Sequence, residues 1–100
     1  MMKGEKMQDL QNLISICNLY KQEKFGLEEF QSRITTSAIP ENLSKDFLEL
    51  LIRFDNQIEE IMFCQSESEH KKHAEKIADE LIRETLLEQE RLKDYRPYKT

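Results

Sequence analysis

The chain has 100 residues and a mass of 12.0 kDa, which is the size of one domain. Charged residues make up 35% of it, and acids outnumber bases to give a formal net charge of -5. Two glycines and two prolines are too few for the closely spaced turns of an all-β domain, and the acidic balance does not favour binding to nucleic acid. The composition therefore predicts a single all-α domain.

The first helix is predicted from about Glu5 to Lys24. Apolar residues recur there every three or four positions, which places them on one face of a helix. They are Met7, Leu10, Leu13, Ile14, Cys17 and Tyr20. Gly26 follows, and we expect it to end the helix because glycine tolerates the left-handed conformation common at helix ends.

A short second helix is predicted from Leu27 to about Thr35. Its apolar residues share one face, with Gln31 at the edge of that face. They are Leu27, Phe30 and Ile34. Two glutamates, at positions 28 and 29, suit the helix dipole because they fall in the first turn. Residues 35–40 end in Ile-Pro and favour extended or turn conformations, so they should break the helix.

The third helix should start near Glu41 and reach about Gln65. It carries the strongest helical periodicity in the chain, sustained for more than five turns. The apolar positions are Leu43, Phe47, Leu50, Leu51, Phe54, Ile58, Ile61 and Met62.

The fourth helix is predicted from about Glu67 to Asp94. The Ser66-x-x-Glu69 pattern has the form of a capping box, and Ser68 is an alternative N-cap. The inner stripe is Ala74, Ile77, Ala78, Leu81, Ile82, Thr85, Leu86 and Leu92. Short connections make neighbouring helices antiparallel. We therefore expect one domain over residues 1–94, an antiparallel bundle of three long helices and one short helix, followed by a flexible tail at residues 95–100.

No motif for phosphate binding, serine hydrolysis or zinc proteolysis occurs. Cys17 and Cys64 fall on or beside apolar stripes and are expected to be buried thiols in a reducing compartment. His70 and His73 lie among charged residues at a helix start, which suits solvated side chains rather than metal ligands. We therefore expect no catalytic site, no cofactor and no metal. No apolar run resembles a signal peptide or a membrane span, which favours a cytoplasmic protein.

Uncompensated acidic charge is concentrated in the third predicted helix. Residues 1–40 carry five acids and five bases, whereas residues 41–63 carry six acids and two bases. Residues 67–94 hold nine acids and six bases. Negative charge of this kind suits a basic partner, because complementary charge raises association rate and specificity. The candidate partner-binding residues are Asp46, Glu49, Asp55, Glu59, Glu60 and Phe63.

Within this set, we expect Asp55, Glu59 and Glu60 to make the main electrostatic contacts. Helical spacing spreads the acids over a broad band rather than one line. Phe63 lies off the main apolar stripe, so it is either an interface anchor or part of a second buried seam. The sequence leaves both alternatives open.

Two segments resemble small helical immunity proteins of bacteria. Residues 19–34 end a first helix, turn, and open the next with Glu28-Glu29-Phe30-Gln31-Ser32-Arg33-Ile34, similar to an E-E-F-x-x-[RK]-[IL] pattern in those proteins. Residues 54–61 have a similar D-N-x-[IL]-E-E-I character. The resemblance is to colicin D-type immunity proteins and to some from contact-dependent growth inhibition systems. It implies an inhibitor that binds one cognate toxin domain, often a nuclease, and occludes its active site.

The expected function is therefore a cytoplasmic immunity protein that meets a basic toxin nuclease through an acidic helical face. It would bind neither nucleic acid nor membrane directly. The alternative is a homo-oligomeric helical protein, such as a homodimer, with a structural or regulatory role. Continuous apolar spacing along the third and fourth helices could also form a seam between two copies.

Overall fold

The chain folds into four helices. The computed structural model describes residues 2–40 and 42–93, with side chains from Asp9 onward. The helices are α1 (Met2–Lys21), α2 (Leu27–Thr35), α3 (Lys45–Cys64) and α4 (Glu67–Lys93). No strand occurs in these residues, so the all-α prediction is confirmed. The predicted tail, residues 95–100, lies outside the described part of the chain.

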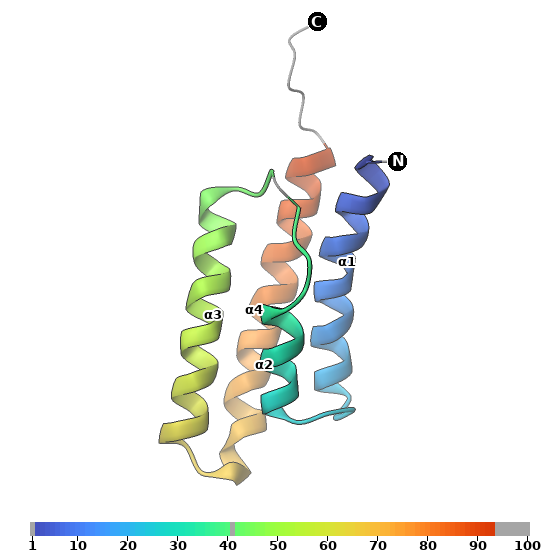
Figure 1. Cartoon of the computed structure of the whole chain (residues 1–100). Coiled ribbons are helices and arrows are strands. Elements are labelled where there is room, and N and C mark those ends of the chain that lie inside the picture. The colour runs from blue at the N-terminus through green and yellow to red at the C-terminus, as the bar shows by residue number, and fades with distance from the viewer. Residues whose placement is uncertain (1, 41, 94–100) are drawn as a thin grey trace, which may run out of the picture.

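The longest helix, α4, lies at the centre of the arrangement. Figure 1 shows α4 between α1 and α3, and α2 with the segment after it crosses one face of α4. The chain reverses direction at each connection (Figure 1). α4 packs against all three other helices, and α2 packs against both α1 and α3. One flank of α3 therefore faces α2, while the other faces the edge of α4.

Aromatic rings join three of the helices in the core. The rings of Tyr20 on α1 and Phe30 on α2 are stacked, with centroids 4.4 Å apart. Phe54 of α3 meets Phe30 edge-on, with centroids 5.3 Å apart. On α4, Ala74 and Ala78 are buried in the same core, and their small side chains allow close backbone approach. The other buried apolar residues are Leu10, Leu13, Ile14, Cys17, Leu27, Ile34, Phe47, Leu50, Ile58, Ile61 and Leu81.

The turn after α1 differs from the prediction. The helix ends at Lys21 rather than near Lys24, and Glu23, not Gly26, takes the left-handed conformation with φ 64°. The Lys24 amide donates to the Leu19 carbonyl at 3.0 Å, and the Glu23 amide donates to the Tyr20 carbonyl at 2.8 Å. These bonds form a Schellman motif, which requires the left-handed residue at position 23. Gly26 is extended (φ -86°, ψ -175°) and is the N-cap of α2.

The start of α3 also differs, since the helix begins at Lys45 rather than near Glu41. Ser44 is the N-cap, and its hydroxyl accepts a hydrogen bond from the Phe47 amide at 3.1 Å. The Glu88 carboxylate on α4 accepts bonds from both the amide and the hydroxyl of Ser44, at 2.7 and 3.0 Å. The local cap therefore defines the start of α3, and the bonds to Glu88 hold that start against α4.

The boundaries of α4 agree more closely with the prediction. α4 starts at Glu67, which places Ser66 rather than Ser68 just before the helix. It is described to Lys93, and the predicted last residue, Asp94, lies outside the described part of the chain.

Two side chains predicted to be buried are exposed. Leu86 follows Thr85, which is fully buried, and so turns onto the outer face of α4. Cys64 is the last residue of α3 and is exposed because the helix has passed the core at that point. The other thiol, Cys17, is buried as predicted, and its burial raises its pKa to about 12.

Candidate protein-binding surface

The acids of α3 and α4 differ in whether they have basic partners. Seven acids of α4 form ion pairs, within the helix or with residues of α1 and α3: Glu69, Glu75, Asp79, Glu80, Glu84, Glu88 and Glu90. Among the side chains that the structure describes, none of the five candidate acids of α3 forms one. Arg53 of α3 is itself paired with Glu80, at 3.3 Å. Most of the described acids without an ion-pair partner therefore lie on α3.

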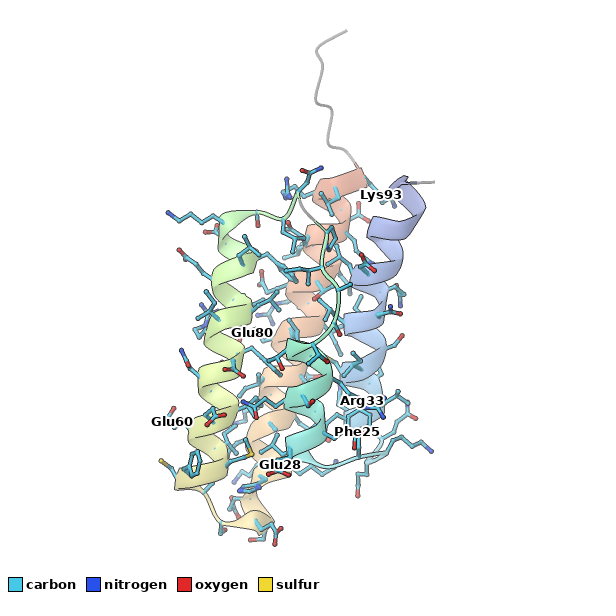
Figure 2. All side chains as sticks on the ribbon, in the orientation of Figure 1. Phe25, Glu28, Arg33, Glu60, Glu80 and Lys93 are labelled. Carbon is cyan, nitrogen blue, oxygen red and sulfur yellow. The ribbon has the colours of Figure 1, made fainter. Side chains whose placement is uncertain are left out.

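The fold separates the candidate acids into two groups. Asp55 and Glu59 lie on the flank of α3 that faces α2, where the Gln31 amide donates to both of them, at 2.8 and 2.9 Å. Glu60 lies on the other flank and lines a groove against α4 (Figure 2). Helical spacing places Asp46 and Glu49 on that second flank. The structure thus does not bring the predicted acids together into a single site.

Gln31 steadies the first group. Carboxylates four residues apart on one helix repel each other. The amide nitrogen of Gln31 lies between Asp55 and Glu59 and donates a hydrogen bond to one oxygen of each. Gln31 is held there because α2 buries its neighbour Phe30. The shared donor therefore offsets part of the repulsion between the two carboxylates and keeps them side by side.

Exposed apolar side chains extend the first group along α3. Leu48 is 40% exposed, Ile52 66% and Phe63 82%, so Phe63 is not part of the core. With Asp55 and Glu59 they follow each other at steps of four, three, four and four residues, and so share one side of the helix. We call these five residues the outer stripe. Scattered apolar residues are ordinary on a surface, but a line of them with acids between is a candidate contact surface.

Two grooves border the outer stripe on the side of α2. The first is largely apolar and is lined by Ile34, Thr35, Ser37, Ile39, Leu51, Ile52, Asp55 and Asn56. The second is acidic along its rim and is lined by Gly26, Leu27, Glu28, Gln31, Glu59, Met62, Phe63, Glu67 and His70. No lysine or arginine is among the described residues that line either groove.

The single arginine of α2 is directed away from this surface. Arg33 pairs with Glu29 at 2.6 Å and lies over the Phe25 ring, 4.5 Å from its centroid. Figure 2 shows Arg33 and Phe25 on the side of α2 away from α3. The α2 residue that does reach the stripe, Gln31, is neutral. The acids of the outer stripe therefore keep their charge available to a partner.

Three residues of this surface were not predicted from the sequence. Leu48 and Ile52 fall outside the inner rhythm of α3, and that departure was a signal that could have identified them. Gln31 gave only a weak signal, as a polar residue at the edge of the inner face of α2. Its role depends on a contact between residues far apart in sequence, which periodicity does not report.

Within the described residues, no cluster of histidine, cysteine and acidic side chains could hold a metal ion. The ring of His70 lies 3.0 Å from the Gln65 carbonyl oxygen, and that of His73 lies 4.0 Å from Glu69. None of the helices in the described part of the chain is both long enough and apolar enough to cross a membrane.

The chain matches no protein-family model, no curated protein and no solved structure. The likeness to helical immunity proteins therefore rests on residues 19–34 and 54–61 alone. The properties of the α2–α3 surface carry the functional inference.

Proposed function

We propose that the chain is a cytoplasmic immunity protein that neutralises a cognate bacterial toxin, most simply a nuclease, by occluding its active site. It acts as one antiparallel bundle of three long helices and one short helix. Binding is stoichiometric, with no turnover, cofactor or metal. The protein contacts its partner through the acidic face of α3.

The observation that supports this proposal is the unpaired acidic charge on α3 beside the paired acids of α4. A nuclease must attract phosphate, so its active site lies in a positive field. Fixed carboxylates opposite that field steer the encounter and exclude partners of the wrong charge. Exposed apolar side chains next to the carboxylates, above all Phe63, supply the area that is buried in a stable complex.

The experiment uses the chain as bait in its native cell, followed by an activity assay of the captured protein. We expect a toxin domain with a basic surface, whose activity falls with added chain and reaches full inhibition at one-to-one stoichiometry. Inhibition should weaken as salt rises, because the attraction is screened. A captured toxin that stays active with saturating chain would overturn the proposal.

Charge-reversal variants test the face. Glu59→Lys with Glu60→Lys should leave the helical circular dichroism spectrum unchanged and strongly weaken inhibition at low salt. Glu84→Lys with Glu90→Lys makes the same change in charge on α4, at acids that already have basic neighbours, and should have a smaller effect. Equal effects of the two pairs would remove α3 as the binding face.

A second candidate function, a homo-oligomeric structural or regulatory protein, is favoured by the exposed apolar residues of α3. A two-fold pairing through the outer stripe would, however, bring Asp55 and Glu59 close to their own copies. Like charges across an interface oppose association. The distribution of charge therefore favours a basic partner over a second copy.

A further inference from the structure

The outer stripe has the spacing of a helix-docking surface. Ile52 and Phe63 are eleven positions apart in the sequence, which corresponds to about 16 Å or three turns of helix. Its ends are apolar and its middle is acidic, with Asp55 and Glu59 one turn apart. The grooves beside it, between α2 and α3, follow the same line. An amphipathic helix laid in a groove makes contacts at this period.

The middle of the stripe is prepared to accept hydrogen bonds. Gln31 bonds to one oxygen of each carboxylate, Oδ1 of Asp55 and Oε2 of Glu59. The other oxygen of each makes no hydrogen bond or ion pair within the described structure. A guanidinium group can donate to such oxygens in a fixed geometry, so arginine suits the position better than lysine.

The opposite flank of α3 is less suited to a basic partner. The groove that contains Glu60 is lined also by Lys76 from α4. Arg53 on the same flank pairs with Glu80. Positive charge is thus already present there, whereas the second groove on the α2 side adds Glu28 and Glu67 to the acids of the stripe.

Building on the proposed function, we propose that the toxin contacts this protein with an amphipathic helix. One face of that helix carries an apolar, two basic and a second apolar residue in order over three turns. This helix lies along the outer stripe, in the groove between α2 and α3. Its two basic residues, arginine by preference, bond to Asp55 and Glu59, and its apolar residues cover Ile52 and Phe63. Asp46, Glu49 and Glu60 remain outside the contact and act only through the overall field.

Three synthetic helical peptides test this pattern without a toxin. The first has leucines eleven residues apart with two arginines at the third and seventh positions after the first leucine, which is the spacing of the stripe itself. The second replaces the arginines by glutamates, and the third replaces the leucines by alanines. Binding is measured by fluorescence anisotropy at low salt. We expect the first peptide to bind at least about fivefold more tightly than either of the others.

Two variants with equal change in charge locate the contact. Asp55→Asn with Glu59→Gln should weaken binding of the first peptide at least about fivefold. Glu49→Gln with Glu60→Gln should change the affinity for that peptide less than about twofold. Both pairs are close to isosteric and leave the core residues untouched. Circular dichroism and urea unfolding confirm that each variant is folded.

Equal weakening by the two pairs, equal binding of the glutamate peptide, or no binding of the first peptide would each overturn the inference. The proposed function fails separately, when no toxin is inhibited by the chain. If the Asp55→Asn, Glu59→Gln variant inhibits the toxin as well as the unmodified chain does, the proposed function stands. The contact of a toxin helix with Asp55 and Glu59 is then excluded.

Discussion

Glu88 is the only charged side chain among the described residues that is buried, with 6% of it exposed. Its carboxylate accepts hydrogen bonds from the Ser44 amide, the Ser44 hydroxyl and, at 2.7 Å, from Arg91. Arg91 also donates to the Asn42 carbonyl at 2.6 Å. Burial alone would raise the pKa of Glu88, but the bonds from Arg91 and Ser44 outweigh it and lower the pKa. This network holds the start of α3, and with it the outer stripe, against α4.

Replacing Glu88 by glutamine keeps the shape of the side chain but removes its charge. It also places an amide group opposite three donors, the Ser44 amide, the Ser44 hydroxyl and Arg91. We expect the free energy of unfolding, measured in urea at neutral pH, to fall by about 1–3 kcal/mol. The folded pKa lies below the ordinary value of 4.5, so the contribution of Glu88 is full above 4.5 and is lost as pH falls through the folded pKa. The difference in free energy of unfolding between the unmodified chain and Glu88→Gln should therefore become smaller in acid. Glu90→Gln, an exposed control, should change stability by less than about 0.5 kcal/mol. A gap for Glu88→Gln that stays constant with pH would contradict this account.

Among the helices, α2 begins without a side-chain cap. Gly26 is extended at the N-cap and its position makes no cap hydrogen bond. A Cβ built on it meets nothing within 4 Å. The place therefore accepts a residue with a side chain, and the extended backbone suits serine.

We expect Gly26→Ser to raise the free energy of unfolding by about 0.5–1 kcal/mol, through a new cap bond and a less flexible unfolded chain. Thermal and urea unfolding measure the change. Gly26→Ala is the matched control, since it restricts the unfolded chain without supplying a cap. Serine less stable than alanine would show that no cap bond forms.

The helices themselves could be predicted from the sequence because local spacing encodes them. The repeated apolar steps from Phe47 to Ile61 identify α3, and those from Ala74 to Leu81 identify α4. The ends were less predictable, since they depend in part on tertiary contacts. Ser44 is a local signal for a helix that begins at Lys45, and the prediction from about Glu41 overlooked it. The bond between Ser44 and Glu88, 44 residues away in sequence, could not be predicted from local spacing.

The candidate surface was predictable in charge but not in arrangement. A count of acids and bases identifies α3 as the acidic helix. Among the described side chains its acids form no ion pair, which agrees with that count. The count does not show that α2 divides these acids, with Asp55 and Glu59 on its side and Glu60 on the other. Nor does it show that Phe63 is exposed, because that depends on how far α2 extends along α3.

At the scale of the whole molecule, the uneven pairing of charge gives the two edges of the bundle different properties. The α1–α4 edge is joined by ion pairs such as Lys21 with Asp79 and Lys71 with Glu23. The α3 edge carries exposed apolar side chains and unpaired acids. Apolar contact favours self-association of that edge, whereas the acids oppose it, and the balance determines whether the chain is a monomer.

We expect the chain to be a monomer of 12.0 kDa by light scattering at low salt, because two copies joined through the outer stripe would oppose Asp55 and Glu59 to their own copies. Asp55→Asn with Glu59→Gln removes that repulsion and leaves Ile52 and Phe63 exposed, so the average mass should rise with concentration. Glu49→Gln with Glu60→Gln lowers the net charge equally but off the stripe, and should remain a monomer. A stable dimer of the unmodified chain at low salt would mean that apolar contact outweighs the acids. The outer stripe would then be a self-association surface, and the second candidate function would be preferred.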